Sequence, residues 1–199
     1  MIALGAPCCL TAREKNRLAA ATSRRLLKRV FEKLTLPLRS RAHLRLRELW
    51  TTERGGTRGF DGHKRVKGRK RHLLVDTLGM VVARRVEAAN VSDRRVGARL
   101  LAGLQSGLPS IRTVMADAGY ESGKLACELK RCHGWRLHIT KRRQRAFKVV
   151  GLTWIVERTF AWLARNRRLS KDYELKVQTS EVFIDLAAIR LMLKRLAPR

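Results

Sequence analysis

Residues 72–89 read HLLVDTLGMVVARRVEAA, and this stretch decides the fold of the chain. The run from His72 to Asp76 is apolar, and the run from Met80 to Ala89 is rich in valine and alanine. The residues between them, DTLG, form a turn sequence, because Asp accepts hydrogen bonds from the following backbone and Gly tolerates a positive φ. The stretch therefore predicts a β-hairpin of two strands joined by a tight turn.

Segments of helical and extended character alternate after this hairpin. Four of them are expected to be, in order, a helix, a buried strand, a helix and a strand, at Arg94 to Leu104, Ile111 to Ala116, Ser122 to Arg131 and Trp135 to Thr140. Apolar residues at helical spacing predict two further helices, from Trp154 to Arg167 and from Ser180 to Leu196, the second with Ser180 as its N-cap. This order predicts an α/β fold in which helices flank a mixed sheet.

The charge balance of the chain predicts a polyanionic partner. Its 199 residues include 45 Lys and Arg against 16 Asp and Glu, a formal net charge of +29. Nucleic acid is the expected partner, because binding to a cationic surface releases condensed counterions. The apolar stretch from Ile2 to Leu10 is much shorter than the ~20 residues of a membrane span and lacks the preceding basic flank of a signal peptide. We therefore expect a cytoplasmic protein with no membrane partner.

Two carboxylates are candidates for chemistry. Asp117 follows the apolar strand that ends at Ala116, and Glu157 lies in the first turns of the helix that starts at Trp154. Two-metal sites of phosphoryl transfer hold Mg²⁺ between carboxylate oxygens on rigid elements. We predict that both residues are catalytic and bind metal. On spacing alone, the alternatives are a turn or cap residue for Asp117 and a solvent-exposed ion pair for Glu157.

Two groups of basic residues are predicted to contact DNA phosphates, because such one-sided runs of charge have no internal counterions. One group lies in the segment from Thr57 to Lys70, which is rich in Gly and basic residues and is predicted to be a loop, and the other begins directly after Glu157. If the helix continued, Lys171 would lie close to the same face as Glu157. A merely solvated face is the alternative. The predicted contacts are Lys64, Lys67, Arg69, Lys70, Arg158, Arg165, Arg167, Arg168 and Lys171.

Three stretches of the chain resemble the DDE transposases of bacterial insertion sequences, in the IS-five-like group. They are RGFDGHKRVKGRKRHLLVDTLGMVV at 58–82, ADAGY at 116–120 and WIVERTFAWLARNRRLSKDYE at 154–174. The resemblance runs from about Thr51 to the C-terminus and implies an RNase H-like α/β domain. It also implies Mg²⁺-dependent cleavage of DNA at terminal inverted repeats and joining to target DNA. In that family the matching positions make Asp117 the second catalytic Asp and Glu157 the catalytic Glu.

The N-terminal part departs from this resemblance. The family carries its first catalytic Asp in a segment similar to DSQSVKTTE, whereas the chain reads RLRELWTTE from Arg45 to Glu53, so that Arg45 stands where the Asp would be. Because a cation replaces a metal ligand, we expect impaired catalysis. A non-catalytic DNA-binding remnant is the alternative, and composition alone also allows an RNA-binding protein.

The same departure suggests two parts. Residues 1–50 form a basic, atypical segment, either poorly ordered or translated from a shifted reading frame, and residues 51–199 form the RNase H-like catalytic domain. Whether the first strand of the sheet is missing or degenerate is left open, as is the oligomeric state, for which a homo-oligomer is one option.

Overall fold

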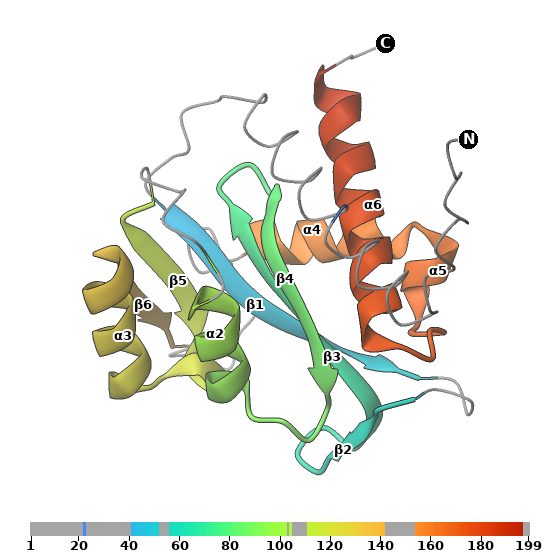
Figure 1. Cartoon of the computed structure of the whole chain (residues 1–199), viewed down its shortest axis with the longest axis horizontal. Helices are drawn as coiled ribbons and strands as arrows, with labels where there is room; N and C mark the ends of the chain where they lie inside the picture. Colours follow the sequence, from blue (N-terminus) through green and yellow to red (C-terminus); the bar gives the residue numbers. More distant parts are fainter. Residues whose placement is uncertain are drawn as a thin grey trace, which may run out of the picture.

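A computed structural model of the chain describes Thr22 and residues 41–51, 56–102, 104, 111–141 and 154–196 (Figure 1). The strands are β1 (Arg41–Trp50), β2 (Gly59–Asp61), β3 (Val66–Asp76), β4 (Val81–Ala88), β5 (Thr113–Asp117) and β6 (Arg136–Thr140). The helices are α2 (Asp93–Ala102), the 3₁₀ turn η1 (Ala118–Tyr120), α3 (Gly123–His133), α4 (Trp154–Ala164), α5 (Arg167–Ser170) and α6 (Val177–Leu196).

The strands form one six-stranded mixed sheet in the order β2-β3-β1-β5-β6, and β4 also pairs with β3. β3 runs antiparallel to β1, β2 and β4, whereas β5 runs parallel to β1 and β6. At the centre of the sheet, Leu44 of β1 lies opposite Leu74 of β3 and Ala116 of β5. The predicted α/β fold, a mixed sheet flanked by helices, is confirmed.

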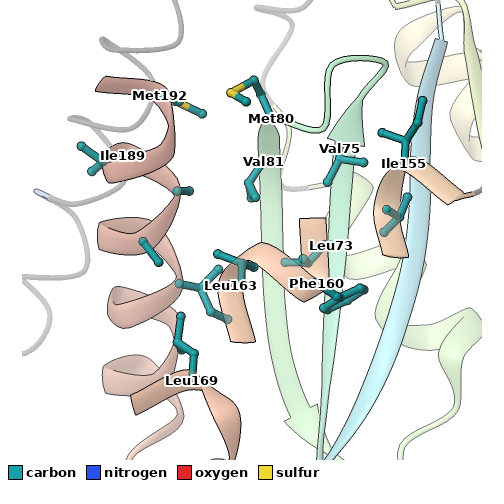
Figure 2. Close-up of a cluster of buried hydrophobic side chains, with 14 of the residues drawn as sticks. Leu73, Val75, Met80, Val81, Ile155, Phe160, Leu163, Leu169, Ile189 and Met192 are labelled. Atoms are coloured by element: carbon teal, nitrogen blue, oxygen red, sulfur yellow. The ribbon is translucent and has the colours of Figure 1, made fainter. Parts of the chain in front are cut away.

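Alternation along the strands gives each face of the sheet its own hydrophobic core. Leu73 and Val75 of β3 point to the face covered by α4, α5 and α6, where they pack with residues such as Phe160 and Ile189 (Figure 2). Leu74 points to the opposite face and joins a second core with residues of α2 and α3. The hairpin turn that connects β3 to β4 is built as predicted, because Asp76 Oδ1 accepts backbone hydrogen bonds at 2.9 and 2.7 Å from the two N–H groups at 78 and 80.

The first strand, which the sequence left open, is present and central. β1 pairs with β3 through nine residue pairs and with β5 through four. Ala42 and Leu44 are buried against α2 and α3, while Arg45 and Arg47 alternate with them and face the other side. β1 lies on the N-terminal side of the boundary at residue 51. The prediction that residues 1–40 belong to an atypical segment concerns residues that the structure does not describe, except for Thr22. The reading-frame hypothesis stays a prediction.

Three local predictions need correction. Val66–Lys70, predicted as loop, extends β3, because it pairs with both β1 and β2. The helix predicted from Trp154 to Arg167 is shorter and does not continue to Lys171. α4 ends at Ala164, and the backbone and side-chain N–H groups of Asn166 both donate to the carbonyl of Leu163 at 3.0 Å. The N-cap predicted at Ser180 is wrong, since α6 begins at Val177.

In the part of the chain that the structure describes, no helix has both the length and the apolar character needed to cross a bilayer.

Candidate functional site

The central strands place Arg45 and Asp117 side by side. Leu44 and Ala116 are paired across β1 and β5, and both point into the core on the α2 and α3 face. The next residue of each strand therefore points to the opposite face, where α4 crosses the sheet (Figure 1). Arg45 and Asp117 occupy these two positions, so the sheet brings the Arg to the edge where the predicted catalytic Asp stands.

Glu157 reaches the same point from α4. Its Oε1 lies 2.9 Å from Nη2 of Arg45, and the two side chains are 51% and 23% exposed. Arg45 also acts on Asp117: burial raises the pKa of the Asp117 carboxyl, and the Arg45 charge opposes that rise. Arg45 is therefore ion-paired with Glu157 and also acts electrostatically on Asp117.

Asp117 also has the structural role that was the alternative reading. Its Oδ1 accepts a hydrogen bond of 3.1 Å from the backbone N–H of Gly119 and so caps the turn η1. Tyr120 anchors this turn to the protein interior, because its ring is completely buried and its hydroxyl lies 2.6 Å from Nδ1 of His72. Capping orients the Asp117 carboxylate without removing it from the surface, so the two readings are compatible.

Further acids beside Asp117 are partly neutralised by lysines. Burial raises the pKa of Asp93, Lys70 opposes this rise, and the Asp117 charge adds a smaller upward contribution. The Lys70 amine lies 2.8 Å from Asp61 and 3.2 Å from Asp93. Lys64 in turn contacts Glu48 at 2.7 Å. The acids around Asp117 are thus only partly neutralised, because Lys70 is shared between Asp61 and Asp93.

The residues present do not fit a pair of Mg²⁺ ions as they stand. Among the described residues, no group of three or more His, Cys, Asp or Glu side chains is placed to hold a metal ion. Arg45 already supplies Glu157 with the positive charge that a metal would supply, and a second cation would be repelled by it. The resemblance seen in the sequence implies a divalent metal, and Arg45 is the residue with which that implication conflicts.

Three predicted DNA contacts have structural roles. Arg69 is fully buried and donates to the carbonyl oxygens of Thr57, Glu174 and Leu175 at 2.7, 2.7 and 2.8 Å, and to Asp172 at 3.3 Å. Lys70 is 7% exposed and paired as described above. In this structure the charged groups of Arg69 and Lys70 bind to carbonyl and carboxylate oxygens of the chain itself.

Arg158 is the third predicted DNA contact that has a structural role. Its guanidinium lies between two indole rings, 4.4 Å from the centroid of Trp154 and 4.6 Å from that of Trp162. It also donates to the carbonyl of Leu78 at 3.1 Å, in the turn between β3 and β4. Arg158 therefore fastens α4 to the hairpin.

Six predicted contacts are exposed and stay predictions: Lys64, Lys67, Arg165, Arg167, Arg168 and Lys171. Of these, Arg168 pairs with Glu174 at 2.8 Å, and Lys64 makes the contact with Glu48.

Sequence reasoning predicted the two acids as catalytic and noted the Arg at position 45, but it missed that Arg45 and Glu157 form an ion pair. The sequence held only part of the information needed to predict this ion pair. The hairpin and the strand before Asp117 fix where the acids lie, while the pairing of β1 with β5 depends on contacts between segments about 70 residues apart.

Comparison with known proteins shows the family of the chain. The family model described as the transposase DDE domain matches residues 27–193. A protein of Burkholderia cepacia that carries the provisional name of transposase for insertion sequence element IS402 is 33% identical over 131 residues. The match covers 60% of the chain and spans 60% of that relative's length. By the extent of the family match, the chain belongs to the transposases that carry a DDE domain.

Proposed function

We propose that this protein binds the terminal inverted repeats of an insertion sequence and its target DNA in the cytoplasm, and that Arg45 impairs the Mg²⁺-dependent cleavage and strand transfer. The observation that carries the proposal is the contact of 2.9 Å between Arg45 Nη2 and Glu157 Oε1. Membership of the DDE family supports DNA as the partner. The IS402 relative supports an insertion sequence as its source.

Charge explains why Arg45 acts against catalysis. Metal-assisted phosphoryl transfer depends on carboxylates that bind divalent ions beside the reacting phosphodiester. Replacing an Asp with Arg changes the formal charge of the site by two units. At an effective dielectric constant of 20, two unit charges 4 Å apart interact with about 4 kcal/mol. A cation beside Glu157 therefore weakens metal binding strongly, while the Arg45–Glu157 ion pair has no net charge with which to repel a DNA phosphate.

The exposed basic residues support DNA binding that does not depend on the metal. Arg165, Arg167 and Lys171 lie exposed after α4, and Lys67 lies exposed on β3. The chain as a whole carries a formal charge of +29. Phosphate contacts of this kind supply affinity without sequence information.

The test is a gain of function at position 45. Arg45→Asp should increase Mg²⁺-dependent nicking of a duplex that carries the inverted repeats of the element encoding this chain, by at least about tenfold over the unchanged protein. The double variant Arg45→Asp, Asp117→Ala should nick no faster than the unchanged protein and should still bind the duplex. Gel-based nicking and fluorescence anisotropy measure the two quantities on the same samples.

The outcomes separate the candidate functions. Equal nicking by the unchanged protein and Arg45→Asp would show that Arg45 does not impair the site. If Arg45→Asp folds and binds but fails to nick, the non-catalytic DNA-binding role is favoured instead. Tighter binding to duplex RNA than to duplex DNA at matched salt would contradict the DNA assignment altogether.

A further inference from the structure

Two arginines lie directly opposite each other on neighbouring strands. Arg47 of β1 pairs with Arg71 of β3 in the antiparallel register. Arg71 lies two residues before Leu73 and therefore shares the face of the sheet that α4, α5 and α6 cover, as Arg47 does. Side chains at opposite positions of an antiparallel pair have Cβ atoms about 4.5 to 5.5 Å apart, and like charges there destabilise the sheet. This pair therefore needs an anion to balance it.

The chain itself supplies no such anion to the pair. Among the described residues, no carboxylate forms an ion pair with Arg47 or Arg71, whereas the neighbouring Arg69 pairs with Asp172 at 3.3 Å. Burial lowers the pKa of Arg71 to about 10; Asp172 opposes this change, and the charges of Arg47 and Arg69 add to it. The Arg71 guanidinium thus stays charged at neutral pH in surroundings that disfavour its charge.

The fold holds the Arg71 guanidinium in place but leaves one of its nitrogens without a partner. Nη1 donates to the carbonyl of Leu169 at 2.7 Å, and Nη2 donates to the carbonyl of Lys171 at 3.2 Å. Arg71 is only 4% exposed, and its Nε is buried without a hydrogen-bond partner among the described residues. An unpaired buried donor costs free energy. This N–H is therefore oriented for an acceptor that the described part of the chain does not provide.

A small pocket lies at the two arginines. It is lined by Arg47, Arg71 and Ser170 and by the apolar side chains of Phe160, Leu163 and Leu169, the last three of which Figure 2 shows. Arg47 and Ser170 are exposed, so the pocket has an open side. It has room for a group about the size of one water molecule, such as one oxygen of a phosphate. Its apolar walls lower the local dielectric constant and so strengthen the attraction between a guanidinium and an oxyanion.

We propose that this pocket binds one phosphate group, held between the Arg47 guanidinium and the Nε–H of Arg71. Guanidinium donors match the oxygens of a phosphate in geometry and charge. Arg47 lies two residues after Arg45 on the same face of β1, about 7 Å along the strand, so the phosphate lies next to the candidate site. The phosphate is either part of a DNA backbone or free inorganic phosphate, and the experiment separates these sources. The site goes beyond the proposed function, which assigns no role to this pocket.

The first measurement is thermal unfolding of the full chain in inorganic phosphate and in sodium chloride of equal ionic strength. Phosphate at ten times its Kd should raise the Tm of the unchanged protein by about 3 to 5 °C. Arg47→Gln should lose most of this rise. Arg41→Gln, the matched control, removes an exposed arginine of the same strand that lies opposite Thr113 rather than a cation, and should keep the full rise. A general effect of phosphate on solvation is common to all three proteins.

The same variants test the repulsion between the two arginines. Without phosphate, Arg47→Gln should have a higher Tm than Arg41→Gln, because only the first substitution removes a like-charge pair. An Arg47→Gln protein that melts no higher than the control would contradict this premise. Arg71→Gln should also lose the response to phosphate. If Arg71→Gln does not fold, Arg47→Gln, at an exposed position, still decides.

The second measurement is fluorescence anisotropy with a labelled DNA duplex. If the phosphate belongs to DNA, inorganic phosphate should weaken duplex binding by the unchanged protein more than chloride does at equal ionic strength, and Arg47→Gln should lose this difference. A phosphate-dependent Tm that requires Arg47, without this competition, would assign the pocket to free phosphate. An equal rise of Tm in Arg47→Gln and the unchanged protein would overturn the pocket. A rise that requires Arg47 in a protein that binds no duplex would support the pocket and contradict the proposed function.

Discussion

His43 and His72 are the side chains whose burial departs most from their usual behaviour. His43 is 1% exposed and His72 is fully buried. Burial lowers the pKa of His43 to about 4 and that of His72 to about 3, because a buried imidazolium loses its hydration. His72 has Tyr120 as a partner, whereas neither ring nitrogen of His43 has a hydrogen-bond partner among the described residues. Both rings are therefore neutral in the folded protein.

These depressed pKa values make folding sensitive to acid. In the unfolded chain a histidine takes up a proton near pH 6.5, whereas the folded protein resists it down to about pH 4 at His43 and about pH 3 at His72. The unfolded state thus binds more protons, and stability falls as the pH drops below about 6.5. Between pH 7 and pH 5 we expect a loss of about 2 kcal/mol per histidine.

His43→Leu should remove one of these two contributions. We expect its free energy of unfolding, measured by urea denaturation, to fall about 2 kcal/mol less between pH 7 and pH 5 than that of the unchanged protein. His63→Leu, at an exposed position, is the control and should keep the full pH dependence. Identical pH profiles for His43→Leu and the unchanged protein would show that His43 is protonated in the folded state.

At the level of elements, β3 carries an unusual series of buried charges. Arg69, Lys70, Arg71 and His72 follow one another, and each is at most 7% exposed. The strand accommodates them because the donors of Arg69 and Arg71 reach backbone carbonyls near α5 and the start of α6, such as the contact of 2.7 Å from Arg71 to Leu169. These carbonyls are acceptors at the ends of short elements, where helical bonding does not satisfy them. β3 thus connects the sheet to the C-terminal helices through arginines.

Lys67 and Arg69, two residues apart on one face of β3, should respond in opposite ways to substitution. Arg69→Met should lower the free energy of unfolding by about 3 to 5 kcal/mol, because it leaves the buried Asp172 without its guanidinium partner. Lys67→Met, at an exposed position, should change stability by no more than about 0.5 kcal/mol and weaken DNA binding.

Urea denaturation and anisotropy on both variants provide the check. A stable Arg69→Met protein that has lost DNA affinity would support the predicted DNA contact of Arg69 and contradict its structural role.

For the whole molecule, the net charge determines how binding depends on salt. The six exposed basic residues that stay predicted DNA contacts each neutralise about one phosphate, and each phosphate contributes about −0.9 to the slope of log affinity against log salt. We expect a slope of about −5 for duplex DNA, measured by anisotropy at several salt concentrations. A slope near zero would show that binding does not use these residues as phosphate contacts.

The same charge should make the folded protein sensitive to low salt in the absence of DNA, because self-repulsion disfavours the compact state. Screening at moderate salt relieves this repulsion.

Local patterns in the sequence sufficed to place most elements of the sheet and its helices. The hairpin of β3 and β4, the strand before Asp117 and the helix that carries Glu157 follow from alternation, turn residues and helical spacing, which depend on neighbours only a few residues away. The same patterns misplaced element ends, such as the start of α6 at Val177, because a periodic pattern of side chains does not specify at which residue the backbone hydrogen bonding of a helix begins.

The partners of the charged residues were decided by the tertiary structure alone. From sequence, Arg45 was a missing metal ligand, Arg69 a DNA contact and Arg158 a phosphate-binding residue. In the folded chain they are respectively the partner of Glu157, a buried link to Asp172 and a cation held between two tryptophans. The physical reason is that a charged side chain is stabilised by the opposite charge, carbonyl oxygen or aromatic face that lies within a few ångströms of it. Such partners come together only when strands and helices far apart in the chain pack against one another.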